Sequence, residues 1–332
     1  MSDVETTRDG RIGCIRLNRP KALNALDLAM ILVIAETLRG WADDPRVHAV
    51  VIEGAGDRAF CAGGDIRAIR AMALSGDAAG IETFFAEEYA LNAAIAAFPK
   101  PYVALIDGIC MGGGIGLSIH GGIRVTSEAG MFAMPETAIG MFPDVGATYA
   151  LPRLPGELGM YLGLTGARLS GADAVHAGIA THFVPRARLA ALREALALDG
   201  VAVVAEHAEG LPAFTLAPHR AAIDRCFEAP DVPAILARLA AEASPWAEET
   251  LGTLRAHSPT ALLFSFSAIR AGAGRTLGQC LAAELALTRH VTCHPDLAEG
   301  VRAMVVDKDR APRWTPARVE DVEVAAIERM LR

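Results

Sequence analysis

The sequence lacks any run of basic residues. Of its 332 residues, 39 are acidic and 31 are basic, which gives a formal net charge of -8. Because nucleic acids are bound through clustered lysine and arginine, this balance argues against a nucleic-acid partner. Charged residues make up only 21% of the chain and hydrophobic residues 52%. Such a composition can bury a substantial core and excludes extensive disorder.

An uninterrupted hydrophobic segment is also missing. The most apolar window, "PYVALIDGICMGGGIGLSIHGG" (101–122), contains Asp107, His120 and seven glycines, so no membrane span is expected. The first residues, "MSDVETTRDGRIGCIRL", do not combine a basic start with an apolar stretch. No targeting peptide is therefore predicted, and a cytoplasmic enzyme is the expectation.

No CxxC pair occurs among the six cysteines, at positions 14, 61, 110, 226, 280 and 293. Buried thiols are therefore expected, because free cysteine is usually buried and disulfide frameworks belong to small secreted domains. Cys293 and His294 are neighbours, but two residues do not complete a tetrahedral metal site. No metal is predicted.

Short apolar segments alternate with helical patterns through the first part of the chain. Strands are predicted over 11–17, 47–54 and 102–108, and a helix over 77–98 that Pro99 and Pro101 end. This alternation indicates an α/β fold. Strand signals fade after about residue 187 into alanine-rich helical segments. We therefore predict a core over 1–186 and a mainly helical C-terminal region over 187–332.

Two glycine-rich loops each follow a predicted strand and precede a helical pattern. They are "AFCAGGDI" (59–66), in which Asp65 is suited to cap the next helix, and "GICMGGGIG" (108–116). At adjacent strand ends they could direct two backbone N–H groups at one oxygen, as an oxyanion hole for a thioester carbonyl requires. A tight turn is the simpler alternative for the first loop. A phosphate site is disfavoured because the second lacks the lysine and hydroxyl of a P-loop.

Several motifs resemble the crotonase, or enoyl-CoA hydratase/isomerase, superfamily, and more narrowly its 3-hydroxyisobutyryl-CoA hydrolase branch. They include the two glycine loops and the segments "LNRPKALNAL" (17–26), "FAMPETAIGMFPDVGATYALPRL" (132–154) and "LTGARLSGADAVHAGIATHFV" (164–184). The resemblance extends to the tail "EGVRAMVVDKDRAPRW" and covers most of the chain, with few matches over 187–255. It implies a spiral of ββα units with a helical C-terminal region that binds acyl-CoA esters.

The resemblance also implies roles for individual residues. The backbone N–H groups of Gly64 and Gly113 match the family's oxyanion hole, and Glu136 matches the second glutamate of its hydratases. Asp144 matches the aspartate typical of the hydrolase branch. The expected substrate-binding residues are Glu88, in "FFAEEYALN", together with Ala62 and Asp65.

One position departs from the hydratase pattern. The first glutamate of the hydratase pair would fall two residues after the triple glycine, where this chain has Gly116. Two-glutamate hydration is then excluded, since glycine has no side chain to donate or accept a proton. The resulting hypothesis is hydrolysis of 3-hydroxyisobutyryl-CoA to CoA and 3-hydroxyisobutyrate, a step of valine breakdown, with no cofactor beyond the CoA of the substrate.

Simpler interpretations remain for the carboxylates. Glu136 could be a helix-start or loop residue after Pro135, Asp144 could be an N-cap, and Glu88 could lie on a solvated helix face. Whether Glu136 attacks the carbonyl or activates water is also open. Rival functions are a hydratase or isomerase of the same superfamily and, from another class, a non-catalytic acyl-CoA binding protein. A homo-oligomer is a further expectation from the family.

Overall fold

The chain forms two compact units, each assembled from three segments of the sequence. The computed structural model describes residues 2–323, 325 and 327. Unit 1 comprises Met1–Gly64, Glu87–Ala133 and Arg168–Thr215, and unit 2 comprises Asp65–Ala86, Met134–Ala167 and Leu216–Arg332. Contacts within the chain define these two units. The predicted division into a core over 1–186 and a helical region over 187–332 was drawn from sequence patterns, and that division stays a prediction. After β10 (His182–Phe183), every regular element of the described residues is helical.

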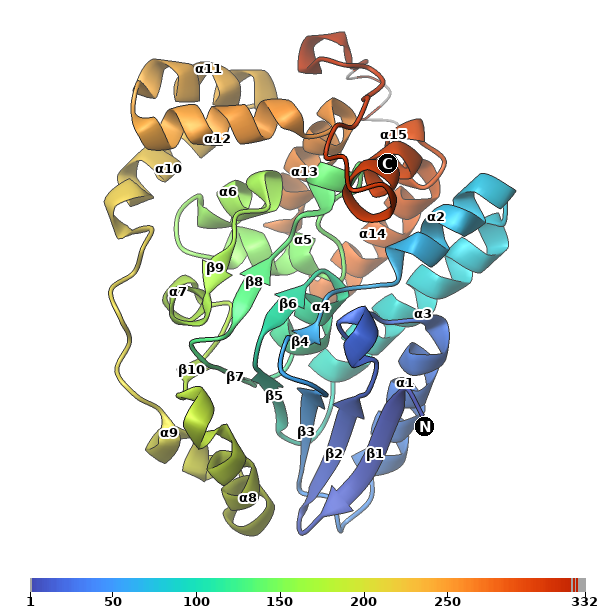
Figure 1. Cartoon of the computed structure of the whole chain (residues 1–332), viewed down its shortest axis with the longest axis vertical. Coiled ribbons are helices and arrows are strands. Elements are labelled where there is room, and N and C mark those ends of the chain that lie inside the picture. Colours follow the sequence, from blue (N-terminus) through green and yellow to red (C-terminus); the bar gives the residue numbers. More distant parts are fainter. Residues whose placement is uncertain (1, 324, 326, 328–332) are drawn as a thin grey trace. The chain divides into compact units, whose positions relative to one another are not determined.

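Unit 1 contains a six-stranded sheet (Figure 1). Its order is β1 (Val4–Asp9), β2 (Ile12–Leu17), β3 (Ala49–Gly54), β5 (Tyr102–Ile106), β7 (Ile123–Thr126) and β10. Only β1 and β2 pair antiparallel; the remaining neighbours are parallel. The apolar sequence of β5 is buried at every position, as expected for a central parallel strand covered on both faces. The α/β class and all three predicted strands are confirmed.

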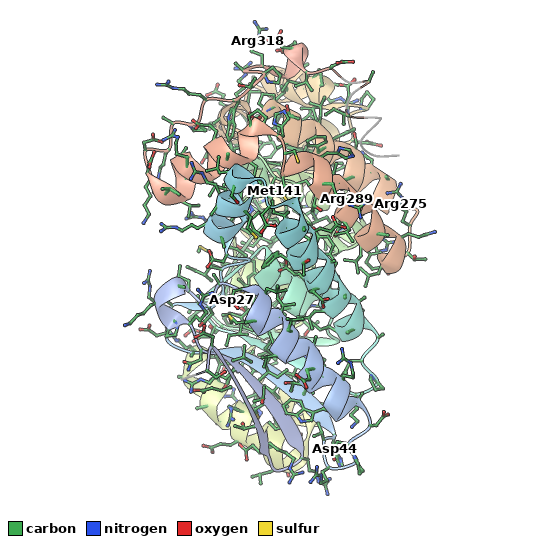
Figure 2. All side chains as sticks on the ribbon, turned by 90° about the vertical axis from the view of Figure 1, so that its right-hand side faces the viewer. Asp27, Asp44, Met141, Arg275, Arg289 and Arg318 are labelled. Carbon is green, nitrogen blue, oxygen red and sulfur yellow. The ribbon has the colours of Figure 1, made fainter. Side chains whose placement is uncertain are left out.

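Part of the predicted helical region packs against this sheet. Leu192 and Leu196 of α8 (Leu189–Asp199), with Val203 and Val204 beyond it, share one buried apolar cluster with strand residues of β2, β3, β5 and β7. On another helix, α1 (Leu28–Ala42), the buried face is centred on Ile31, Ile34 and Leu38. Asp27, labelled in Figure 2, caps α1 by accepting a hydrogen bond from the Met30 N–H at 2.9 Å.

A second, four-stranded sheet in unit 1 carries the glycine loops. Its order is β4 (Ala59–Cys61), β6 (Ile109–Met111), β8 (Met131–Ala133) and β9 (Leu169–Ser170). Strands β4 and β6 are parallel neighbours, so the loops that follow them leave the same edge of the sheet. The predicted placement of both loops at adjacent strand ends is confirmed. The second loop leads directly into α4 (Gly113–Ile119).

Unit 2 is formed by helices and short helical turns. The longer ones are α2 (Ile66–Ser75), α6 (Leu158–Thr165), α10 (Arg220–Phe227), α11 (Val232–Glu242), α12 (Pro245–Ala256), α13 (Pro259–Gly272), α14 (Leu277–Val291) and α15 (Pro295–Val301). The unit boundary falls inside α3 (Ala78–Ala96), which ends before Pro99 as predicted. Ser-Pro pairs start α12 and α13, with the serine capping and proline in the first turn. Helix α13 is buried over most of its length and contacts α6, α11 and α14.

None of the helices within residues 2–323, 325 and 327 combines the length and apolar character that crossing a bilayer requires.

Candidate active site

The first glycine loop is tied to the segment that precedes α1. The Leu26 N–H donates to the Gly63 carbonyl at 2.8 Å, and the Ala62 N–H donates to the Leu23 carbonyl at 3.0 Å. Leu26 also forms an isolated parallel bridge with Gly64. These bonds fix the backbone on which the predicted Gly64 amide lies. They also occupy the N–H of Ala62, so a substrate contact there would have to use another group.

The second glycine loop lies against the first. A side chain added to Gly114 would place its Cβ 2.3 Å from the Cys61 carbonyl oxygen, and one added to Gly113 would place its Cβ 3.3 Å from the Gly64 nitrogen. Only glycine allows the backbones to approach this closely. Gly63 has a φ of 107°, and its Cβ would lie 3.5 Å from the Gly113 nitrogen. The structure thus brings the two predicted oxyanion residues together in unit 1.

Glu88 lies beside this pair of loops. Its side chain is 3% exposed, and its Oε1 atom is 2.5 Å from where a Gly113 Cβ would be. The alternative of a solvated helix face is therefore wrong for Glu88. That description fits Glu82 on the same helix, which forms a surface ion pair with Arg289 at 2.6 Å; Figure 2 labels Arg289.

Asp65 begins unit 2 and has the capping role that the sequence predicted. Its carboxylate accepts a hydrogen bond from the Ala68 N–H in the first turn of α2, at 3.4 Å. A role for Asp65 or Ala62 in substrate binding stays a prediction.

Glu136 opens a short 3-10 helix, η2 (Glu136–Ile139), directly after Pro135. Local sequence predicts this start, but the side chain is only 7% exposed, which is unusual for a loop carboxylate. The next residue anchors η2 inside unit 2. The Thr137 hydroxyl donates to the Leu164 carbonyl at 2.9 Å and lies 2.9 Å from Nδ1 of His257. Burial lowers the pKa of His257, so the ring is neutral at pH 7.

Asp144 is 6% exposed and starts a tight turn. Its carbonyl accepts a hydrogen bond from the Ala147 N–H at 2.8 Å, and Val145 and Gly146 between them have φ values of 54° and 81°. Positive φ at both central residues matches a type I′ turn. The residue before α5 (Ala147–Ala150) is Gly146, so the alternative that Asp144 is an N-cap is wrong.

Sequence reasoning missed Glu284, which is 2% exposed on α14. Its Oε2 atom accepts a hydrogen bond from the Gly146 N–H at 2.7 Å, and its Oε1 atom accepts one from the Thr148 N–H at 3.1 Å and another from the Thr148 hydroxyl. One signal was present: Glu284 falls at helical spacing among Cys280, Leu281, Leu287 and Val291, on the buried face of α14.

Burial is the main cause that raises the pKa of Glu284 to about 8. Hydrogen bonds from Thr148 and Gly146 oppose this rise, while the negative charge of Asp144 adds to it. Strongly shifted carboxyl groups in buried sites are candidates for functional roles.

The predicted residues therefore fall into two groups. Unit 1 holds Gly64 and Gly113 with Glu88 and Ala62, and unit 2 holds Glu136 and Asp144 with Asp65. Gly116 is buried on α4 in unit 1, where it contributes no side chain to any reaction.

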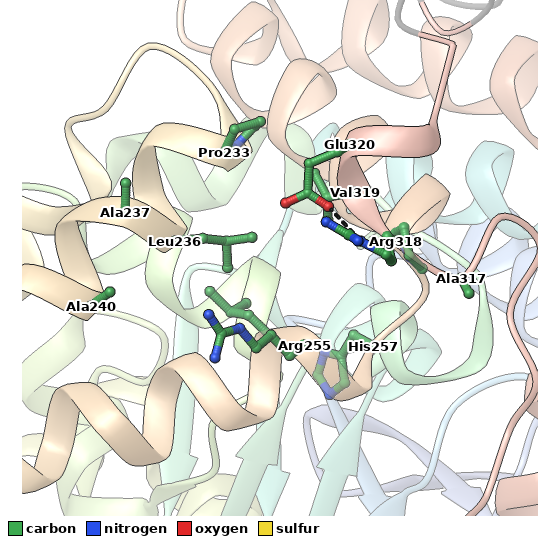
Figure 3. A pocket seen from close by; sticks show the side chains of 12 residues that line it. Pro233, Leu236, Ala237, Ala240, Arg255, His257, Ala317, Arg318, Val319 and Glu320 are labelled. Carbon is green, nitrogen blue, oxygen red and sulfur yellow. Dashed lines mark hydrogen bonds and ion pairs between the residues drawn. The ribbon is translucent and has the colours of Figure 1, made fainter.

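A cavity of about 520 Å³ lies in unit 2 between α11, α12 and residues 317–320 (Figure 3). Apolar side chains such as Leu236 and Val319 line it, together with Arg255, His257 and an Arg318–Glu320 ion pair at 3.2 Å. None of the predicted site residues lines this cavity.

Five of the six cysteines are buried as expected, but Cys293, in the turn after α14, is exposed. Burial raises the pKa of the Cys61 thiol to about 12, so this neighbour of the glycine loops is not an ionised nucleophile at pH 7. Within the described part of the chain, no group of three or more His, Cys, Asp or Glu residues is placed to hold a metal ion.

The enoyl-CoA hydratase/isomerase family model matches residues 12–331, and the chain belongs to this family. Similar curated proteins are named 3-hydroxyisobutyryl-CoA hydrolase, mitochondrial. The one from Xenopus tropicalis is 47% identical over 95% of this chain and 85% of its own length. The human one is 46% identical over 96% and 86%.

Solved structures confirm the fold. A carnitinyl-CoA dehydratase from Mycobacterium thermoresistibile matches with a TM-score of 0.96 and 41% identity, covering all of this chain and 97% of the other. An enoyl-CoA hydratase from Rhodobacter sphaeroides matches with a TM-score of 0.94 and 42% identity, covering 99% and 97%. The crotonase-like fold is confirmed, as is the resemblance to the hydrolase branch.

Proposed function

We propose that this protein hydrolyses 3-hydroxyisobutyryl-CoA, releasing CoA and 3-hydroxyisobutyrate. The observation that carries the proposal is Gly116, which removes one carboxylate of a hydratase pair, while Glu136 remains as a buried acid. The names of the curated relatives, which share 43–47% of their residues with this chain, support the same reaction.

The proposed chemistry needs an oxyanion hole and one carboxylate. The N–H groups of Gly64 and Gly113 hold the thioester carbonyl oxygen as it gains negative charge, an effect worth about 3–4 kcal/mol per donor. Glu136 either attacks the carbonyl carbon, which expels the CoA thiolate and leaves an anhydride for water to cleave, or removes a proton from the attacking water. In both routes the thiolate takes up a proton and water supplies the hydroxyl of the acid product.

Asp144 is proposed to bind the 3-hydroxyl group of the substrate. A site that hydrogen-bonds a hydroxyl can reject analogues without it by about 10⁴-fold in favourable cases. Glu88, Ala62 and Asp65 are proposed as substrate contacts. The oxyanion role of the glycine loops receives support from their close approach.

The names of the similar solved structures favour a second candidate, hydration or dehydration of an acyl-CoA. That reaction would run on Glu136 alone. Crotonyl-CoA hydration, assayed beside thiol release from 3-hydroxyisobutyryl-CoA, separates the two functions.

The decisive variant is Glu136→Gln, which keeps the size of the side chain but can neither attack nor accept a proton. We expect loss of CoA release by at least about 10²-fold, because general acid–base catalysis typically contributes about 10²-fold to 10⁴-fold and a nucleophile is needed for the covalent route. Glu248→Gln, at an exposed position of α12, is the matched control. Near-normal turnover by Glu136→Gln would remove this residue from the mechanism, and thioester binding without product by the wild type would favour a binding protein.

Three accompanying proposals concern the setting of the reaction. No cofactor is needed, because CoA is part of the substrate. The location is proposed to be cytoplasmic, whereas the names of the vertebrate relatives specify mitochondria. The protein is a homo-oligomer, as the family resemblance implies; light scattering of the purified chain tests this directly.

A further inference from the structure

We propose that Glu284 is a positioning residue for Asp144: its carboxyl group holds the 146–148 backbone and thereby sets the side chain that selects 3-hydroxyacyl substrates. This inference rests on the proposed function of Asp144. Glu284 and the turn both lie in unit 2, 138 residues apart in sequence. Helices α14 and α5, which carry the two sides of the contact, are labelled in Figure 1.

The turn that carries Asp144 requires external support. Val145 is a β-branched residue at a φ of 54°, a backbone region that β-branched residues rarely adopt because it is sterically strained. The Val145 side chain is nevertheless 1% exposed, so it cannot relax toward solvent. A strained turn persists only where surrounding interactions determine it.

Hydrogen bonds to Glu284 supply that support. Its carboxyl group receives hydrogen bonds from the N–H groups of Gly146 and Thr148 and from the hydroxyl of Thr148. A carboxyl group accepts both backbone bonds at once, one on each oxygen. The two N–H groups bracket Ala147, whose own N–H donates to the Asp144 carbonyl. Any movement of 146–148 is therefore transmitted to the backbone of Asp144.

Glutamine tests this geometry with little change in volume. Its NH₂ group can only donate, so in either orientation of the amide it would face the N–H of Gly146 or of Thr148. One backbone N–H then loses its acceptor and the turn shifts. Displacement of a positioned group by about 1 Å can lower a rate by about 10²-fold.

The readout is preference between two substrates that differ only in the hydroxyl, 3-hydroxyisobutyryl-CoA and isobutyryl-CoA. In the wild type, kcat/KM should be much higher for the hydroxylated ester, and Asp144→Asn should abolish this preference. Glu284→Gln should reduce the preference by about 10-fold to 10²-fold, by slowing the hydroxylated ester while changing isobutyryl-CoA hydrolysis less than about threefold. Glu248→Gln serves as the exposed control.

A purely structural role for Glu284 would slow both esters alike and leave their ratio unchanged, and that result would overturn the inference. A wild-type ratio near one would overturn the proposed role of Asp144 and this inference with it, whereas a wild-type preference that Glu284→Gln leaves intact overturns the inference alone.

Thr148→Val provides a second variant that retains the backbone N–H and the β-branched shape but removes the hydroxyl donor. It should lower the preference by a smaller factor, about threefold to tenfold, in line with one lost hydrogen bond to a carboxyl group. If Glu284→Gln gives no folded protein, Thr148→Val becomes the test of the proposal. An unchanged ratio of kcat/KM between the two esters in Thr148→Val would contradict it.

Discussion

The contact between the glycine loops can be tested by adding one methyl group at Gly113. In Gly113→Ala the new Cβ would lie 2.5 Å from Oε1 of Glu88 and 3.3 Å from the Gly64 nitrogen, where ordinary contact begins at 3.4 Å. The Glu88 carboxylate must therefore move by about 1 Å to restore normal contact. Because Glu88 is 3% exposed, that movement displaces packed neighbours.

Opposing effects on stability can be compared. Alanine is favoured over glycine inside a helix by about 1 kcal/mol, while overpacking a buried site costs about 1–3 kcal/mol. We expect a net loss in the free energy of unfolding of at most about 2 kcal/mol. The effect on kcat should be larger than the effect on stability, because crowding the Gly64 amide disturbs both proposed oxyanion donors. Loss of one such donor lowers kcat by about 10²-fold to 10³-fold.

The assay is thiol release from 3-hydroxyisobutyryl-CoA together with urea unfolding of the same preparations. The matched control is Gly122→Ala, also in unit 1, where no atom lies within 4 Å of an added Cβ; it should change stability by less than about 0.5 kcal/mol. A Gly113→Ala enzyme with kcat within threefold of the control would refute the argument that this close approach organises the catalytic amides.

Two further predictions concern stability. In the native protein the pKa of Glu284 is about 8, against a usual value of 4.5. The contribution of Glu284 to the free energy of unfolding is therefore fully present below about pH 4.5. This contribution is lost as pH rises to about 8, at about 1.4 kcal/mol per pH unit. Asp144 and Cys280 interact with Glu284 and are both retained in Glu284→Gln, so this variant is the reference for the titration of Glu284 alone. The free energy of unfolding of the wild type relative to this variant should therefore fall by about 3 kcal/mol between pH 5 and 7.5, and a constant difference in urea unfolding would contradict the raised pKa. Separately, Asp27→Ala should lower the free energy of unfolding by about 1 kcal/mol through loss of the α1 cap, with Asp27→Asn retaining most of it; equal losses in both variants would show that the ion pair with Arg19 dominates instead.

Local sequence patterns were sufficient to predict much of the fold. The β-branched segment at 49–54 and the apolar segment at 102–106 form buried parallel strands because continuous apolar sequence suits a strand covered on both faces. The α3 helix ends before Pro99 because proline cannot continue a helix. Asp65 caps α2 because its position before the helix already determines that hydrogen bond.

Burial of individual carboxylates could not be predicted in the same way. Glu82 and Glu88 lie on one helix, yet Glu82 pairs with Arg289 at the surface and Glu88 is buried beside Gly113. Periodicity says which residues share a face but not what covers that face. The exposure of Cys293 was missed for the same reason, because it depends on how the turn after α14 lies.

By itself, the sequence determined the family, the glycine loops at adjacent strand ends and the absence of a carboxylate at position 116, because these depend on residue type and short spacing along the chain. Tertiary structure decided that Glu284 bonds to the turn after Asp144 across 138 residues, and that Gly113 lies against Gly64 and Glu88. The physical reason is that a buried polar group must find its hydrogen-bond partners wherever packing brings them, at sequence separations that no local pattern records.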